Sequence, residues 1–359
     1  MDCSILDYNL PDERIARFPA QKRDESKLLV YDRASGKISH AVFREIADFL
    51  PTNFDFFRNN AAVLKARIFA KKSTGAEVEC LLLTPVDGDV WNCMLRPAKR
   101  LKNGATFGVD GAFSATVLEH LENGNCVVKF DLDKRFSNAV EMAEEIGVVP
   151  LPPYIRRNQH SPEYDKTFDN SRYETVYADS NKRVAAAAPT AGLHFTNELI
   201  ESLRARGDRF FNLTLHVGIG TFQPLKTDIV EEHKMHAELY EIPAPTLHAL
   251  AERKNPRLAV GTTSLRAMED FCRKHGGNFD PEKPVIDSAS LFVYPPQRVV
   301  SADAMITNFH LPRSTLMCLV SAFIAPESLD GIGILKDIYK TAIEHEYNFY
   351  SYGDAMLIL

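Results

Sequence analysis

The sequence lacks an apolar run long enough to cross a bilayer, and it lacks paired cysteines. A membrane-spanning helix needs about 18–20 consecutive apolar residues, and every apolar stretch here is shorter. Residues 1–11 contain no basic segment followed by an apolar one, so no secretory signal is visible. The six cysteines are scattered without a Cys-x-x-Cys pair, which favours reduced thiols over a disulfide framework or a zinc ribbon. We therefore expect a cytoplasmic protein without membrane association.

An excess of positive charge is also missing. The chain has 42 Lys and Arg against 48 Asp and Glu, a formal net charge of −6 at pH 7. Because phosphate is bound through Lys and Arg, any contact with nucleic acid must use a local basic patch. The 359 residues, 45% of them hydrophobic and 25% charged, suffice for two soluble domains with a substantial core.

The pattern of apolar and polar residues along the chain changes near residue 65. Short alternating apolar runs separated by Gly, Asp and Asn predict a small all-β barrel or sandwich. These runs are 78–83, 90–95, 115–121 and 125–130. From Glu174 onward, strands alternate with helix-length segments, which predicts an α/β architecture. We expect helices over 41–50, 197–206, 245–254, 264–275, 316–323 and 335–346.

Five of the 11 histidines lie in short segments that generic structural elements do not explain: His194, His216, His233, His236 and His310. Histidine titrates near neutrality, so such a group suits proton-transfer chemistry. The first segment, 185–196, is rich in small residues and lets backbone approach a ligand closely. The structural alternative is a buried strand leading into a helix that Thr196 caps.

The string His233-x-x-His236-x-Glu238 allows three interpretations. On a helix the two histidines share a face and could bind a metal, although no further ligand cluster completes a site. A polar surface turn is the second possibility. Substrate binding or proton transfer is the third.

Two further motifs combine hydroxyl groups with expected helix starts. Gly261-Thr262-Thr263-Ser264 follows the apolar strand 257–260 and would present backbone amides to an anion, or simply cap a helix. Arg266 would add a bidentate grip on that anion, or be a solvated helix residue. Asn308, His310, Ser314 and Thr315 surround Pro312, and form either an acid–base site or a capped turn.

Nine segments, in order and almost from end to end, resemble the S-adenosylmethionine:tRNA ribosyltransferase-isomerase family of queuosine biosynthesis. They are 7–11, 151–155, 172–178, 189–196, 215–222, 233–238, 260–264, 307–315 and 350–356. The resemblance implies a large α/β barrel-like domain, residues 1–64 and 151–359, that carries an inserted β-barrel domain of residues 65–150.

The resemblance also implies an unusual reaction. S-adenosylmethionine would donate its ribosyl group to the aminomethyl group of a deazaguanine at the tRNA wobble position. Adenine and methionine would leave, and the ribose would rearrange to the epoxycyclopentanediol of epoxyqueuosine. Such an enzyme needs no separate cofactor and no metal, because S-adenosylmethionine is a co-substrate.

Motif positions and local chemistry together nominate the site residues. His194, His216, His236 and His310 are the catalytic candidates. Expected substrate contacts are Arg172, Thr175, Pro189, Thr190, Gly192, Phe195, Gly218, Gly220, Thr221, Phe222, His233, Glu238, Gly261, Thr262, Thr263, Arg266, Asn308, Ser314, Thr315, Tyr352 and Asp354. Lys99, Arg100, Lys102, Arg156 and Arg157 are expected to contact tRNA, although charge runs are commonly just solvated faces.

Several positions depart from the family pattern. The segment 59–63 reads Asn-Asn-Ala-Ala-Val where the family has Asn-Asp-Thr-Arg-Val. Residues 184–186 replace Gly-Ser-Val, Asn348 replaces an arginine, 295–297 replaces Pro-Gly-Tyr, and Lys27 replaces an arginine. Arginine is not interchangeable with alanine or asparagine where an anion is held. A diverged, non-catalytic or altered-substrate tRNA-binding paralogue is therefore the alternative.

Overall fold

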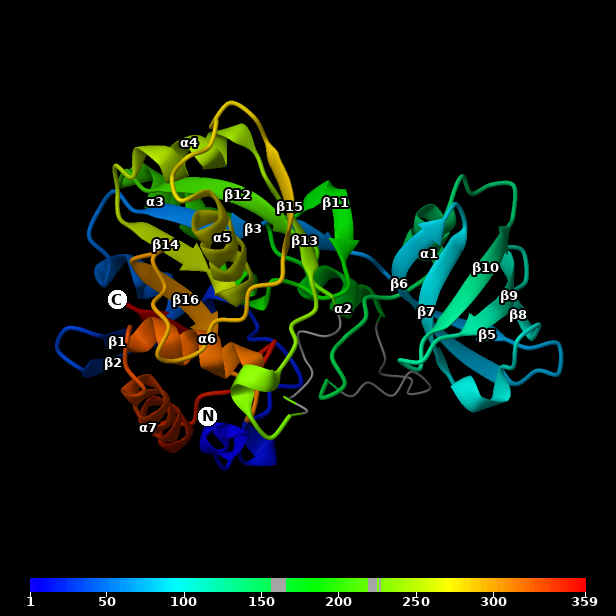
Figure 1. Cartoon of the computed structure of the whole chain (residues 1–359), viewed down its shortest axis with the longest axis horizontal. Helices are drawn as coiled ribbons and strands as arrows, with labels where there is room; N and C mark the ends of the chain where they lie inside the picture. Colours follow the sequence, from blue (N-terminus) through cyan, green and yellow to red (C-terminus); the bar gives the residue numbers. More distant parts are fainter. Residues whose placement is uncertain (156–165, 219–224, 226) are drawn as a thin grey trace.

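The computed structural model of the chain describes residues 1–155, 166–218, 225 and 227–359. It combines a nine-stranded mixed sheet, flanked by helices, with a closed six-stranded antiparallel barrel (Figure 1). Within these residues no helix is both long and apolar enough to span a membrane.

The large sheet has the strand order β15-β13-β12-β3-β14-β16-β17-β1-β2. Its strands are β1 (Lys27–Asp32), β2 (Lys37–Val42), β3 (Asp55–Asn59), β12 (Arg209–Leu215), β13 (Glu238–Ile242), β14 (Arg257–Val260), β15 (Val285–Ala289), β16 (Ala304–Asn308) and β17 (Ala355–Ile358). The central strands β12, β3, β14 and β16 run parallel to one another. Every residue of β3, β14 and β16 is buried, as expected for strands that are covered on both faces.

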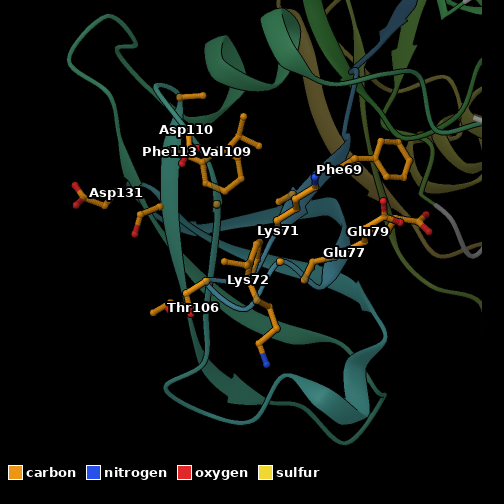
Figure 2. A pocket seen from close by; sticks show the side chains of 18 of the residues that line it. Phe69, Lys71, Lys72, Glu77, Glu79, Thr106, Val109, Asp110, Phe113 and Asp131 are labelled. Atoms are coloured by element: carbon orange, nitrogen blue, oxygen red, sulfur yellow. The ribbon is translucent and has the colours of Figure 1, made fainter. Parts of the chain in front are cut away.

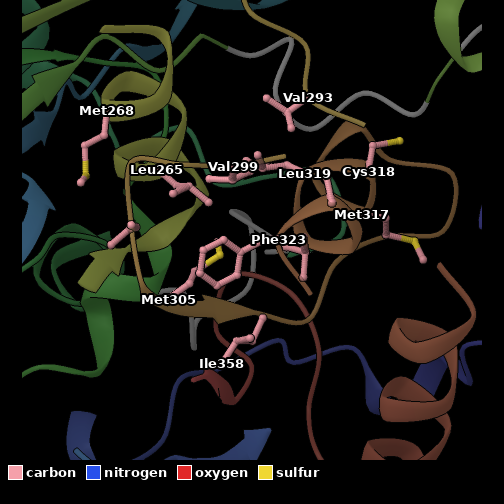
Figure 3. Packing of buried hydrophobic residues seen from close by; sticks show 14 of the residues in the cluster. Leu265, Met268, Val293, Val299, Met305, Met317, Cys318, Leu319, Phe323 and Ile358 are labelled. Atoms are coloured by element: carbon pink, nitrogen blue, oxygen red, sulfur yellow. The ribbon is translucent and has the colours of Figure 1, made fainter. Parts of the chain in front are cut away.

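Helices contribute buried side chains to hydrophobic clusters that they share with the sheet. They are α3 (Asn197–Ala205), α4 (Ala244–Glu252), α5 (Gly261–His275), α6 (Thr315–Ile324) and α7 (Asp330–Glu344). The short helix α2 (Lys166–Arg172) is not part of these clusters. Figure 3 shows side chains of α5 and α6 packed with sheet residues, for example Leu265, Phe323, Met305 and Ile358. A separate two-stranded sheet joins β4 (Ala61–Val63) to β11 (Asp179–Ala185).

The barrel has its own hydrophobic core. Its strands are β5 (Arg67–Lys71), β6 (Glu77–Asp87), β7 (Val90–Arg96), β8 (Thr106–Val109), β9 (Phe113–His120) and β10 (Cys126–Leu132), and α1 (Ala139–Ile146) packs on it. Alternate residues point inward, as in β7, where Trp91, Cys93 and Leu95 are buried.

The sequence-based prediction of a mixed α/β fold with a small β-barrel is confirmed. The strand 257–260 is β14, and Thr196 caps α3 through a 3.1 Å bond from the Leu199 amide to its Oγ1. The helix expected over 41–50 is wrong. Residues up to Val42 continue β2, because that segment pairs with β1, and Phe43–Asp48 form a short 3-10 helix.

Helix α5 begins three residues earlier than expected. Gly261 has φ of +89°, which lets the chain turn from β14 into the helix without an intervening loop. Gly261, Thr262 and Thr263 therefore belong to the first helical turn.

The parallel centre of the sheet is held at one end by a buried carboxylate. Asp55, fully buried at the start of β3, accepts bonds of 2.8 and 2.7 Å from Arg209 of β12 and one of 2.9 Å from Asn255. These contacts set β3 in register with its neighbour.

We predict that Asp55→Ala lowers the free energy of unfolding by about 2–3 kcal/mol, since it removes three hydrogen bonds to a charged group. The check is urea denaturation followed by circular dichroism. Glu201→Ala is the control: it breaks the exposed ion pair with Arg204 and should cost about 0.5 kcal/mol or less. Equal effects of the two variants would contradict the assigned role of Asp55.

Candidate active site

Two small cavities adjoin at one edge of the large sheet. Because β12, β3, β14 and β16 are parallel, their carboxyl ends meet there. Ligand sites of open α/β sheets form at such an edge. Directly after β14 and β16 the chain enters α5 and the turn that leads to α6.

The first, which we call the polar cavity, has a volume of about 50 Å³. Its walls carry hydroxyl, amide and imidazole groups beside the rings of Tyr154, Phe309 and Tyr350. Its lining residues are Tyr154, Ala188, Thr190, Ala191, Val217, Gly261, Thr262, Thr263, Thr307, Asn308, Phe309, His310, Leu311, Ser314, Leu316, Tyr350 and Ser351.

The second, which we call the apolar cavity, has a volume of about 30 Å³. Aliphatic and aromatic side chains line it, together with one ion pair. Its lining residues are Leu215, Met235, Glu238, Thr262, Thr263, Arg266, Leu291, Phe292, Val293, Thr315, Leu316 and Leu319. Thr262, Thr263 and Leu316 line both cavities, so the two share a wall.

His194 is held in a directional chain of hydrogen bonds. The Ser26 hydroxyl donates to the Arg23 carbonyl (3.2 Å), so its oxygen accepts from His194 Nδ1 (2.7 Å). His194 Nε2 then carries the lone pair and accepts from Asn308 Nδ2 (3.2 Å). The Thr190 hydroxyl donates to Asn308 Oδ1 (2.9 Å). His194 thus fixes the orientation of the Asn308 amide, and does not itself line either cavity.

His310 has the opposite tautomer. The Thr307 hydroxyl donates to the Asn308 carbonyl (3.3 Å), so His310 Nε2 donates to Thr307 Oγ1 (2.8 Å). The lone pair therefore lies on Nδ1. Among the five histidines of the sequence motifs, His310 is the one that lines the polar cavity.

Both buried imidazoles are neutral at physiological pH. Burial lowers the pKa of His194 to about 3, and the positive charge of Arg23 acts in the same direction. Burial alone lowers the pKa of His310 to about 3. Desolvation disfavours the charged form of a buried histidine.

Glu238 and Arg266 form the ion pair of the apolar cavity. Glu238 contacts Arg266 Nη1 and accepts a 2.9 Å bond from the Gly218 amide. Arg266 also donates to the carbonyls of Leu291 (3.2 Å), His236 (3.0 Å) and Ala289 (2.8 Å). The guanidinium predicted to grip an anion is therefore largely occupied within the protein.

The other motif histidines lie apart from the polar cavity. His216 Nε2 stands 3.5 Å from Glu241, which also pairs with Lys182, and burial lowers the pKa of His216. The side chain of His236 is exposed, and His233 packs against Phe292 with ring centroids 5.5 Å apart. Residues 233–237 form neither a helix nor a strand. Within the described ranges no three His, Cys, Asp or Glu side chains are placed to hold a metal ion.

Several residues predicted to contact the substrate do not line either cavity and instead pack behind the residues that do. A Cβ added to Gly192 would lie 1.9 Å from the Tyr177 hydroxyl, so this position needs glycine for close packing. Thr175 is buried beside it, and Phe195 packs edge-on against Phe43. Pro189 is buried and precedes the 3-10 helix Thr190–His194.

The predicted contacts Arg172, Tyr352 and Asp354 also bond within the protein. Arg172 donates to the carbonyls of Ala20 and Gln21, and Tyr352 to Asp169. Asp354 accepts bonds of 2.7 Å from the amides of Lys27 and Asn348.

Ser314 and Thr315 lie at the start of α6. The Ser314 side chain accepts from the Met317 amide and caps the helix, as the structural alternative predicted. Ser314 lines the polar cavity and Thr315 the apolar one. Gly220, Thr221, Phe222, Arg156 and Arg157 lie outside the described residues.

Sequence reasoning did not single out Tyr154, Tyr350, Leu316, Met235 or Phe292. Tyr154 and Tyr350 stand inside the matched segments 151–155 and 350–356, which was a usable signal. The sequence indicated only that Leu316 begins the expected helix 316–323, and Phe292 lies in no motif.

A larger hollow of about 1,380 Å³ opens on the barrel (Figure 2). It is lined by cations such as Lys71 and Lys72 and by carboxylates such as Glu77 and Asp131. This mixture of charges does not mark a phosphate site. Lys99, Arg100 and Lys102 are exposed near it, around the 3-10 helix Ala98–Arg100.

The residues that depart from the family pattern are accommodated by packing. Ala61 and Ala62 are buried in β4, and Asn60 accepts a 2.7 Å bond from the Thr214 hydroxyl. None of them lines either cavity. The Asn348 side chain is exposed.

Comparisons with known proteins identify what the chain is similar to. The family model described as queuosine biosynthesis protein matches residues 3–358. Proteins named S-adenosylmethionine:tRNA ribosyltransferase-isomerase from Thermotoga maritima and Thermotoga petrophila are each 42% identical over 363 residues, covering all of both chains. A crystal structure of S-adenosylmethionine tRNA ribosyltransferase from Thermotoga maritima is 33% identical, with a TM-score of 0.54, and covers 99% of this chain and 100% of that one.

We predict that stability falls as the pH drops from about 6.5 towards 3. The unfolded chain takes up protons on His194 and His310 below about 6.5, whereas the folded chain does so only near 3. Each histidine then contributes a slope of up to about 1.4 kcal/mol per pH unit. Urea unfolding at pH 7.5, 5.5 and 4.5 measures it.

The variant His310→Gln should flatten this slope, because glutamine does not titrate. A slope unchanged by His310→Gln would mean that the imidazole is charged in the folded state.

Proposed function

Because the chain belongs to the queuosine biosynthesis protein family, we propose that it is an S-adenosylmethionine:tRNA ribosyltransferase-isomerase. It would transfer the ribosyl group of S-adenosylmethionine to a 7-aminomethyl-7-deazaguanine at the tRNA wobble position and isomerise it to epoxyqueuosine. We expect it to act in the cytoplasm, without a metal or a separate cofactor.

The observation that carries this proposal is the pair of adjoining cavities built from the matched segments. Segments 189–196, 260–264, 307–315 and 350–356 all supply walls of the polar cavity. The non-catalytic alternative has no support from the relatives, which are named as enzymes. The departing residues 60–62 lie outside both cavities.

The polar cavity suits proton transfer next to a sugar. The sulfonium makes the adjacent 5′ carbon of the ribose acidic, so a neutral base can remove a proton there. We propose His310 as that base, because it lines the polar cavity and its Nε2 bond to Thr307 leaves the lone pair on Nδ1. The Asn308 amide donates one hydrogen to His194 and has a second one. This second hydrogen can be donated to a ribose oxygen or to an adenine nitrogen.

His194 is a positioning residue in this scheme. It acts through Asn308, whose amide orientation it fixes. Loss of His194 should therefore raise the KM for S-adenosylmethionine, because Asn308 is then free to rotate.

The direct test is to incubate the protein with S-adenosylmethionine and tRNA that carries the deazaguanine amine. Mass spectrometry should detect free adenine, methionine and epoxyqueuosine in the tRNA. Prior dialysis against a chelator should not change the yield, whereas a metal hydrolase built on the histidines would lose activity.

We predict that His310→Ala lowers turnover by about a hundredfold or more while the fold stays intact, since a general base contributes about that much. His248→Ala, on α4 and away from both cavities, is the matched control. Turnover near that of the wild type would make His310 a structural residue only.

We predict that replacing Lys99, Arg100 and Lys102 together with Ala weakens tRNA binding and reduces its dependence on salt. A plot of the logarithm of the tRNA association constant against the logarithm of salt concentration has a negative slope. Each lost phosphate contact makes this slope less steep by about 0.9. Fluorescence anisotropy with labelled tRNA measures this. The exposed triple Lys37, Lys254 and Lys283 to Ala is the control, and an unaltered slope would locate the tRNA contact elsewhere.

A further inference from the structure

We propose that S-adenosylmethionine binds across both cavities, with its nucleoside in the polar cavity and its amino-acid part in the apolar cavity. Leu316 separates the two until the ligand enters. This assignment rests on the proposed function and deepens it, because it states which residues recognise each half of the substrate.

The apolar cavity matches the methionyl half in shape and charge. Leu215, Val293 and Leu319 offer aliphatic surface to its methylene groups. At the same cavity lie the carboxylate of Glu238 and the guanidinium of Arg266, whose side chains are 8% and 10% exposed. An amino acid carries one ammonium and one carboxylate. The Glu238 carboxylate is a partner for the ammonium, and Arg266, whose bonds to Glu238 and to three carbonyls use four of its five N–H groups, has one N–H on Nη1 to donate to the carboxylate.

The polar cavity matches the nucleoside half. The Thr190 hydroxyl and the Asn308 amide lie together on its wall, and Ser314 adds a further hydroxyl. Ribose hydroxyls and purine nitrogens both need such donors and acceptors. The rings of Tyr154 and Tyr350, with centroids 4.7 Å apart, offer an aromatic surface to a purine.

The shared wall is where the sulfonium must lie, since it joins the two halves of the molecule. Thr263 Oγ1 is buried there and makes no hydrogen bond in the part of the chain that the structure describes. A hydroxyl oxygen can turn its lone pairs towards a neighbouring cation. A buried hydroxyl without a partner is costly, so a ligand at this point would satisfy it.

Entry of the ligand requires the wall to open. Ligand sites usually have volumes of about 300–1,000 Å³, far above those of these two cavities. Leu316 is half-buried, whereas its neighbours Thr315 and Met317 are buried. In this proposal the Leu316 side chain moves when the ligand enters, because it is the more exposed of these residues and lines both cavities.

Two variants fill one cavity each. Leu319 lines only the apolar cavity and Ala188 only the polar one, so we choose Leu319→Phe and Ala188→Leu. The probes are S-adenosylhomocysteine, which has both halves, and 5′-methylthioadenosine, which lacks the amino-acid part. Calorimetric titration of the full-length protein gives both affinities.

Leu319→Phe should weaken S-adenosylhomocysteine about tenfold or more and leave 5′-methylthioadenosine within about twofold, because overfilling affects only the amino-acid half. Ala188→Leu should weaken both probes about tenfold or more. The control Leu239→Phe makes the same chemical change at an exposed position of β13 and should alter neither affinity.

Equal weakening of both probes by Leu319→Phe, or of neither, overturns the assignment. If Leu319→Phe fails to fold, Phe292→Ala at the half-buried edge of the apolar cavity replaces it and must show the same selectivity. A wild-type protein that binds neither probe would contradict the proposed function as well. Binding with the wrong pattern contradicts the assignment alone.

Discussion

The parallel alignment of four central strands decides where the candidate site of the large domain lies. β12, β3, β14 and β16 all end at the same edge of the sheet, so the segments that follow them must meet there. The first turn of α5 and the cap of α6 face each other for this reason. Residues more than a hundred positions apart, such as Thr190 and Asn308, then come within 2.9 Å.

Within that edge, hydrogen-bond direction separates the roles of two similar histidines. Both are buried and neutral, yet each hydroxyl beside them has a single proton to give, and that proton goes to a backbone carbonyl. His194 therefore donates through Nδ1 and His310 through Nε2. One imidazole orients an amide, and the other belongs to a residue that lines the cavity and has its lone pair on Nδ1.

Much of the fold follows from local pattern. Alternation in 90–95 indicated a barrel strand, and the threonine before 197–206 indicated a helix start, because both depend on neighbours in sequence. The helix expected over 41–50 failed because pairing with β1, a tertiary contact, extended β2.

The candidate site was predictable only in part. The motifs located the walls of the polar cavity, since small and hydroxyl residues cluster there in sequence. The commitment of Arg266 to Glu238 and three carbonyls depends on segments that come together only in the fold. The sequence did not indicate a role for Leu316, because that residue is distinguished only by lining both cavities, which is a property of the folded chain.

The barrel enters and leaves the large sheet through two segments that bond to each other: the amide of Arg67 donates to Val148 (3.1 Å), and that of Val148 to Arg67 (2.9 Å). β3 must find β12 across 154 residues, as the Asp55–Arg209 contact shows. Chain entropy opposes such a closure more as the loop lengthens. Once the barrel has formed and its two ends are joined, its residues no longer count towards that loop. The kinetics of assembly should then be those of a shorter protein, in which the insertion folds early and speeds the search of the rest.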